Sequence, residues 1–237
     1  MRIFTTCLLL ILCLCTGIRA QEQKISVLLL TGGHGFDRTA FFEMMNAMDN
    51  LEYQELAHPN ATAYFLNPEG YDVILFYDMV QEISEAERAG FETLVKQGVG
   101  LVFLHHAIVS YQDWDFYRDV LGGRYIENGN DNQTQSNYRH DVRFDARIAD
   151  KTHPITQGMK AFDIDDEIYG QVFIAPEANV LISTSHPESM EHLMWCREVN
   201  PKTRSVYLQP GHGPGIFADS NYRELLKNSL EWAAFRK

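Results

Sequence analysis

The sequence has few cysteines, and nearly all of them lie at its start. Cys7, Cys13 and Cys15 fall in or beside an apolar run that follows Arg2, and beyond Ala20 there is only Cys196. A short apolar run after one positive charge, ending at a small residue, is typical of a secretory signal peptide. We therefore expect residues 1–20 to be removed on export to the periplasm or the medium, and residues 21–237 to form one domain without an internal disulfide.

Positive charge is also scarce. The chain has 20 lysines and arginines against 32 aspartates and glutamates, and its net charge of −12 becomes −14 when Arg2 and Arg19 leave with the signal peptide. Such a charge disfavours binding to nucleic acid or to anionic membrane surfaces. The apolar run is shorter than the roughly 20 residues of a membrane-spanning helix, so no membrane span is expected. The expected partner is a small molecule, and a homo-oligomer remains open.

The chain lacks a glycine motif of the nucleotide-binding kind. The apolar segment Ile25–Thr31, a predicted strand, runs into Gly32-Gly33-His34-Gly35 before a predicted helix at about 39–48. The glycine spacing is neither that of a dinucleotide fingerprint nor that of a P-loop. Strand, turn and helix in this order nevertheless predict an α/β fold, with His34 on a loop at the carboxyl edge of its sheet.

Strands and helices continue to alternate through the first half of the chain. Ser84 and Glu87 form a capping box that starts a helix, and Gly98 ends it. Further strands are expected at 53–65 (short), 72–78, 99–104, 138–144, 162–169, 179–185, 192–197 and 204–210, a short helix at 111–117 and a last helix at 222–235. This pattern predicts a doubly wound parallel sheet.

Two predicted strands end in histidine. The buried strand 99–104 is followed by His105 and His106, and the strand 204–210 is followed by His212 between Gly211 and Gly213. Ligands of open α/β sheets bind at the carboxyl ends of the strands, so these imidazoles are candidates for chemistry. For any one of them, a core or loop histidine without a function is the alternative.

An acidic segment adds carboxylates to these candidates. Asp163, Asp165 and Glu167 would share one face of a strand, with Asp166 opposite and Tyr169 close by. Such a segment is either a solvated edge or the source of a general base or metal ligand. The polar loop 128–137, with aromatic residues nearby, suits either a carbohydrate or an ordinary surface insertion.

Taken together, these motifs resemble the ThuA-like, or trehalose-utilisation, family. The motifs that carry the resemblance are the Gly-Gly-His turn, Gly100 to His105, Thr152-His153-Pro154-Ile155 with Gly158, Asp166-Glu167-Ile168-Tyr169, Trp195, and Gly211-His212-Gly213 before the closing helix. The resemblance implies a fold similar to class I glutamine amidotransferases: a flavodoxin-like, doubly wound, mostly parallel sheet with helices on both faces. It also implies a role in disaccharide and keto-sugar catabolism.

The resemblance implies an enzyme that isomerises a 3-keto-sugar or keto-glycoside to its 2-keto form, or a related lyase or hydrolase. The residues expected to be catalytic are His105, His106, Glu167 and His212. Those expected to bind substrate are His34, Asp166, Tyr169, Trp195 and Gln209. His105, His212 and Glu167 are also candidate ligands for a divalent metal, although no HxxxH spacing supports one.

Other functions stay open from the sequence alone. An amidotransferase needs a cysteine nucleophile after the central strand, where this chain has His105 and His106, so that activity is excluded. A non-catalytic carbohydrate-binding protein is the main alternative, and a structural or interaction module that uses the polar loop near Asn130 is a third.

Overall fold

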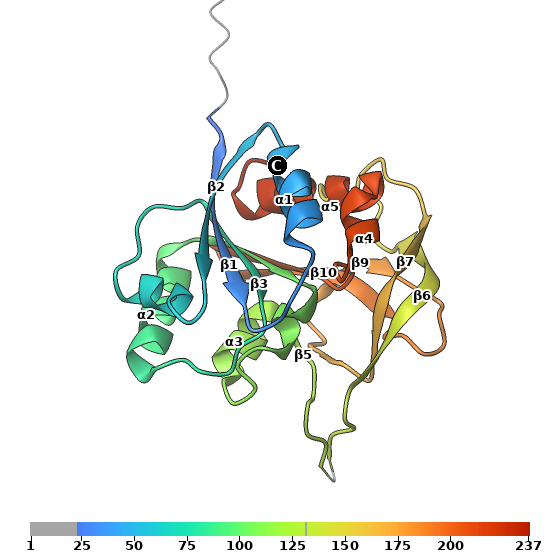
Figure 1. Ribbon diagram of the computed structural model, residues 1–237, viewed down its shortest axis with the longest axis horizontal. Helices are drawn as coiled ribbons and strands as arrows, with labels where there is room; N and C mark the ends of the chain where they lie inside the picture. Colours follow the sequence, from blue (N-terminus) through green and yellow to red (C-terminus); the bar gives the residue numbers. More distant parts are fainter. Residues whose placement is uncertain (1–22, 131) are drawn as a thin grey trace, which may run out of the picture.

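The computed structural model describes residues 23–130 and 132–237, so the predicted signal peptide lies outside the described residues. The strands are β1 (Ile25–Gly32), β2 (Leu51–Ala57), β3 (Val73–Asp78), β4 (Gly100–Leu104), β5 (Gly123–Arg124), β6 (Asn137–Ile148), β7 (Phe162–Gly170), β8 (Phe173–Ile174), β9 (Asn179–Ser183), β10 (His192–Asn200) and β11 (Thr203–Leu208). The α-helices are α1 (Arg38–Asn46), α2 (Glu85–Gln97), α3 (Asp115–Leu121), α4 (Pro214–Ala218) and α5 (Ser220–Ala233). Two 3-10 helices, η1 (Ala61–Leu66) and η2 (His105–Val109), complete them (Figure 1).

A nine-stranded sheet carries the fold, in the order β2-β1-β3-β4-β11-β10-β9-β6-β7. The first five strands are parallel and follow the flavodoxin-like order, because β11 takes the fifth place. The chain therefore reverses direction across the sheet between β1 and β3, and ligands bind at the carboxyl ends of strands near such a point.

The expectation of a mostly parallel sheet is wrong for the other half. All four pairings from β11 to β7 are antiparallel. The reason is local, since β10 and β11 are joined by a tight turn and form a hairpin, which places consecutive strands antiparallel. The sheet is mixed, with a parallel core and an antiparallel extension.

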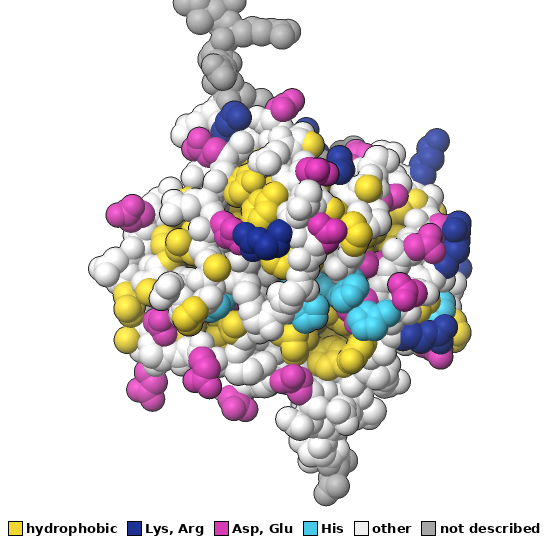
Figure 2. Space-filling model, viewed as in Figure 1, with side chains coloured by type: hydrophobic (Ala, Val, Ile, Leu, Met, Phe, Trp, Pro, Cys, Tyr) yellow, Lys and Arg dark blue, Asp and Glu magenta, His cyan; other side chains and the backbone are white. Residues whose placement is uncertain are grey.

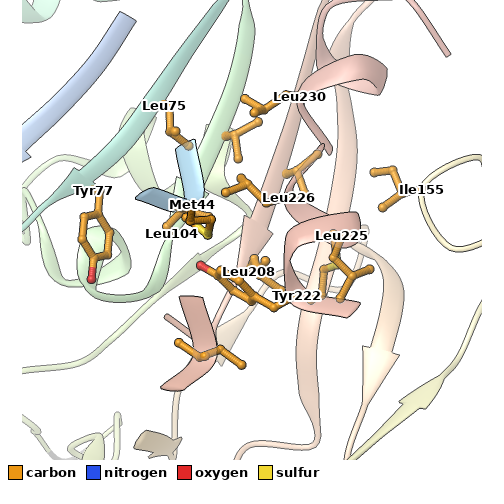
Figure 3. Close-up of a cluster of buried hydrophobic side chains, with 14 of the residues drawn as sticks. Met44, Leu75, Tyr77, Leu104, Ile155, Leu208, Tyr222, Leu225, Leu226 and Leu230 are labelled. Carbon is orange, nitrogen blue, oxygen red and sulfur yellow. The ribbon is translucent and has the colours of Figure 1, made fainter. Parts of the chain in front are cut away.

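Helices cover both faces of the parallel part, as expected. On one face α1, α4 and α5 pack against the sheet, and Figure 3 shows Met44, Leu75, Leu104 and Leu226 meeting there. On the other face α2, α3 and η1 cover strand residues of opposite parity such as Leu101 and Phe103. Because β4 is buried on both faces, its end is held rigidly by packing from both sides.

Several local predictions are confirmed and two change. The capping box of Ser84 and Glu87 starts α2, and Gly98 ends it. The short helix expected at 111–117 is α3 at Asp115–Leu121, and β2 ends at Ala57, before a 3-10 helix. No helix among the described residues is long and apolar enough to cross a membrane.

Candidate functional site

The turn after β4 presents His105 to the carboxyl edge of the sheet. His105 has φ 48°, a left-handed conformation that non-glycine residues rarely adopt and that is common at functional sites. The Tyr207 hydroxyl donates to the His105 carbonyl at 3.0 Å, and the His105 Nδ1–H donates to the Gln209 carbonyl at 2.7 Å. Since a carbonyl only accepts, the Nδ1 of His105 carries the hydrogen, and its Nε2 is free to face the site.

Three potential ligand atoms converge in front of that Nε2. Glu167 Oε2 lies 2.9 Å from His105 Nε2 and 3.2 Å from His212 Nδ1, and the two nitrogens are 3.3 Å apart. His105 and Glu167 are buried and His212 is half-buried. The Tyr169 hydroxyl is also 3.1 Å from His105 Nε2. We call His105, Glu167 and His212 the triad.

The triad has the composition and spacing of a metal site. With metal–ligand bonds of about 2.1 Å, ligand atoms stand about 3.0 Å apart in an octahedron and about 3.4 Å apart in a tetrahedron, close to the observed separations of 2.9, 3.2 and 3.3 Å. Two imidazoles and one carboxylate suit first-row transition metals better than Mg²⁺ or Ca²⁺. Metal-binding histidines usually donate a hydrogen bond from the ring nitrogen that does not bind the metal. His105 makes such a bond, from Nδ1–H to a backbone carbonyl.

The loop that carries His212 is held by Asp166 and Tyr77. The Asp166 carboxylate accepts from the backbone N–H of Gly211 at 2.6 Å and of His212 at 3.2 Å, and the Tyr77 hydroxyl donates to the Gly211 carbonyl at 2.6 Å. Gly211 has φ 146°, and a Cβ there would lie 2.9 Å from the Tyr222 hydroxyl. The loop therefore needs glycine at this position to bring His212 to the triad.

Burial and neighbouring charges set the protonation of the site. Burial opposes ionisation of Glu167, but protonation of His105, which then donates a hydrogen bond and carries a positive charge, lowers the pKa of Glu167 below its usual value, helped by His212 and His140. Burial raises the pKa of Asp166, even though backbone N–H groups partly offset this. Burial, together with the nearby His105, lowers the pKa of both His106 and His212. Neutral imidazoles beside an ionised Glu167 can accept protons or bind a metal.

Two cavities flank Glu167. One, of about 310 Å³, is lined by His34, Met79, His106, Val109, Tyr125, Glu127, Tyr138, His140, Glu167 and Tyr169, and we call it the tyrosine cavity. The other, of about 320 Å³, is lined by Asp141, Asp165, Asp166, Glu167, His212, Gly213, Pro214, Gly215 and Ile216, and we call it the acidic cavity. Figure 2 shows histidine side chains gathered on this face, with hydrophobic side chains beside them. Glu167 forms part of the wall of both.

The structure brings most of the predicted site residues together. The ring of His34 lies 4.7 Å from that of His106 in a tilted arrangement, and both residues line the tyrosine cavity with Tyr169. Gln209 lies behind the triad, where its amide donates to the Glu167 carbonyl at 2.7 Å, so it supports the site from the rear. The carboxylate of Asp166 is engaged by the backbone of the His212 loop.

Trp195 lies in the core, away from the other predicted site residues. Its fully buried indole N–H donates to the Leu121 carbonyl at 2.8 Å, and its ring packs 4.4 Å from Tyr207. The indole lines neither cavity, so its surroundings are those of a core residue.

His140 is a site residue that the sequence analysis did not single out. Its Nδ1 lies 3.4 Å from Glu167 Oε1, and its ring is 4.7 Å from that of His212. It lies on β6, where the pairing with β7 shifts register between Arg139 and Val142. That bulge turns His140 toward Glu167. No residue in the local sequence marks the bulge, and the polar run 139–141 was the only sign that His140 belongs to the site.

Cys196 is far from suited to nucleophilic catalysis. It is a buried residue on β10, and burial raises the pKa of its thiol to about 12. His153 Nε2 lies 3.5 Å from the sulfur, but the pKa of that imidazole is itself lowered by burial. A thiol that stays protonated at neutral pH is a poor nucleophile toward an acyl group.

Comparison with known proteins agrees with this architecture. The model of the ThuA family, described as trehalose utilisation, matches residues 26–233. A ThuA-like protein from Parabacteroides merdae is 16% identical with a TM-score of 0.78, covering 91% of each chain. A ThuA-like protein from Bacteroides uniformis is 20% identical with a TM-score of 0.67, covering 90% of this chain and 93% of its own. PurLQS from Thermotoga maritima, 10% identical with a TM-score of 0.57 over 89% of this chain and 99% of its own, shares the fold. No curated protein matches the sequence.

Proposed function

The chain belongs to the ThuA, or trehalose utilisation, family, and on this premise we propose that it is an exported enzyme that moves a proton beside the carbonyl of a keto-sugar or keto-glycoside. The reaction that fits best is isomerisation of a 3-keto to a 2-keto sugar. The family supports a carbohydrate substrate, and the apolar run within residues 1–20 supports export.

One observation carries this proposal. His105 Nε2, Glu167 Oε2 and His212 Nδ1 converge within 3.3 Å of one another beside a cavity into which further imidazoles point. Such a convergence places several groups that accept or donate protons around one small volume, as enolisation of a sugar requires.

The triad would hold a divalent metal. His105 contributes Nε2, His212 contributes Nδ1 and Glu167 contributes a carboxylate oxygen. When bound, such a metal polarises the carbonyl oxygen of the sugar. Gln209 and Asp166 keep the triad in place from behind, the first through its backbone carbonyl on His105 and the second through the backbone of the His212 loop.

His106 is the group we assign to proton transfer. Its side chain is only 2% exposed, yet both ring nitrogens lack a hydrogen-bond partner among the described residues. A neutral imidazole in this position can take the proton from the carbon beside the carbonyl, which gives an enediolate, and protonation of the former carbonyl oxygen then gives the enediol. Return of a proton to the former carbonyl carbon, and loss of one from the adjacent hydroxyl, completes the isomerisation without an oxidant or reductant.

Product analysis tests the proposal. The purified protein is incubated with 3-keto-trehalose, and formation of the 2-keto isomer is followed by NMR, with and without chelator. We expect turnover in the wild type and a loss of at least about 100-fold in Glu167→Gln, because the amide neither ionises nor binds a metal well.

Asp163→Asn is the matched control. It makes the same change of carboxylate to amide on the same strand, but Asp163 pairs with Arg143 outside both cavities. Equal loss in both variants, or no loss in Glu167→Gln, would contradict the proposal. Binding of the sugar by the wild type without turnover would instead favour a carbohydrate-binding protein.

A further inference from the structure

The two cavities beside Glu167 differ in chemistry. The tyrosine cavity presents Tyr125, Tyr138 and Tyr169 with the apolar side chains of Met79 and Val109. The acidic cavity presents carboxylates, the imidazole of His212 and a glycine-rich turn, without a tyrosine, phenylalanine or tryptophan side chain. The carbon–hydrogen face of a pyranose ring is apolar and packs on flat aromatic surfaces, so the two cavities would receive a sugar ring very differently.

His106 adds a polar group whose ring nitrogens have no hydrogen-bond partner among the described residues. A buried imidazole with two unpaired nitrogens costs free energy unless a ligand or water supplies the missing hydrogen bonds. His106 lines the tyrosine cavity and is held between His34 at 4.7 Å and Tyr77 at 4.6 Å. Its ring nitrogens are therefore available to hydrogen-bond a ligand in the tyrosine cavity.

The β6 bulge builds the outer wall of the same cavity. Arg139 pairs with Ile168 and Val142 with Asp166, so two residues, His140 and Asp141, stand opposite Glu167 alone. The bulge sends His140 to the tyrosine cavity and Asp141, at φ 55°, to the acidic cavity. Tyr138 precedes the bulge, packs 5.2 Å from His140, and is 60% exposed, a large aromatic surface at the cavity mouth.

We propose that the tyrosine cavity is the subsite for the sugar ring, with Tyr138 as the stacking surface, His140 as a hydrogen-bonding partner of its hydroxyls, and His106 at the carbon that loses its proton. This assignment rests on the proposed function and adds to it the place and orientation of the ligand. Tyr138 and His140 are specificity-determining residues that act on the ring, while the acidic cavity lies on the far side of Glu167.

Equilibrium binding tests the assignment. A methyl 3-keto-glucoside is titrated into the protein and its Kd is measured from NMR chemical shifts. Loss of the stacking surface in Tyr138→Ala should weaken binding about tenfold, and His140→Ala should weaken it about fivefold. Folding of each variant is checked by its unfolding midpoint.

The chain offers a matched control for each variant. Phe173→Ala removes another exposed aromatic side chain, from outside both cavities, and Asp141→Asn changes the other residue of the same bulge. Asparagine tolerates a left-handed backbone, so Asp141→Asn should fold. Both controls should leave the Kd within about twofold of the wild type.

The reverse pattern would overturn the assignment, as would absence of binding by the wild type. A tenfold loss in Asp141→Asn with none in Tyr138→Ala would place the ring in the acidic cavity. The proposed isomerisation is tested separately, by measuring product formation. Normal turnover with an unchanged Kd in Tyr138→Ala would contradict only the subsite assignment. The expected binding pattern without turnover would contradict only the proposed reaction.

Discussion

Replacing Gly211 by alanine tests how the fold positions His212. Gly211 has φ 146°, a conformation that costs a residue with a side chain about 1–3 kcal/mol. The new Cβ would stand 2.9 Å from the hydroxyl of Tyr222, a buried residue on α5, and 3.2 Å from His105 Cβ, which adds about 1–3 kcal/mol of overpacking. We therefore expect Gly211→Ala to lose about 3 kcal/mol of unfolding free energy.

Urea unfolding of the two proteins measures this loss. For a domain of this size, about 3 kcal/mol corresponds to a fall in Tm of about 6–12 °C. Gly213→Ala is the control, because a Cβ at Gly213 meets no atom within 4 Å and its φ is −136°. The reasoning is refuted if Gly211→Ala stays within about 0.5 kcal/mol of the wild type, or if Gly213→Ala is destabilised as much.

Four further predictions follow from the described contacts. Trp195→Phe should lose about 1–3 kcal/mol in urea unfolding, because its indole hydrogen bond to Leu121 disappears, and should keep the wild-type Kd for the keto-sugar; a weakened Kd would put Trp195 at the ligand. The Cys196 thiol, with a pKa of about 12, should react with a disulfide reagent at pH 8 only as fast as the protein opens, so rapid labelling of the native protein would contradict its burial. The hydrogen bond from Arg38 lowers the pKa of Glu55 in the folded protein. The wild type should therefore be more stable than Glu55→Gln by about 0.5 kcal/mol at neutral pH, and this difference should vanish as the pH falls through the folded-state pKa of Glu55. A difference in unfolding free energy that stays constant down to acid pH would be inconsistent with this prediction. Zn²⁺ at about 100 times its Kd should stabilise the wild type by about 2.7 kcal/mol in thermal unfolding and should not stabilise His105→Ala; equal shifts would place the metal elsewhere.

The parallel half of the fold and the core of the site were predictable from the sequence. The apolar runs of β1, β3 and β4 are short and bounded by turn residues, which favours buried parallel strands. Because parallel strands end at one edge of the sheet, His105 after β4 and His212 after β11 were expected to lie close together. Their Nε2 and Nδ1 atoms are 3.3 Å apart. Glu167 joins them from β7, where it is buried, although strict alternation groups it with the exposed Asp163 and Asp165.

The antiparallel half was harder to predict because strand order there depends on contacts distant in sequence. The hydrophobic pattern of β6 does not say that it pairs with both β7 and β9, and no residue type announces the bulge that adds His140. Trp195 stands in a motif shared with the family, but only packing shows that its indole bonds to Leu121 in the core. Gln209 supports the site both through its backbone carbonyl, which accepts from His105, and through its side-chain amide, which donates to the Glu167 carbonyl, and the sequence does not reveal either contact.

The most direct test of the central claim is hydrogen exchange at the carbon beside the carbonyl. The protein is mixed with 3-keto-trehalose in deuterated buffer with each of several divalent metals, and deuterium in the sugar is measured by mass spectrometry and NMR. The account predicts incorporation by the wild type and its loss in His105→Ala and in Glu167→Gln, with Asp163→Asn unchanged. Absence of exchange in the wild type with every metal, or full exchange in Glu167→Gln, would contradict it.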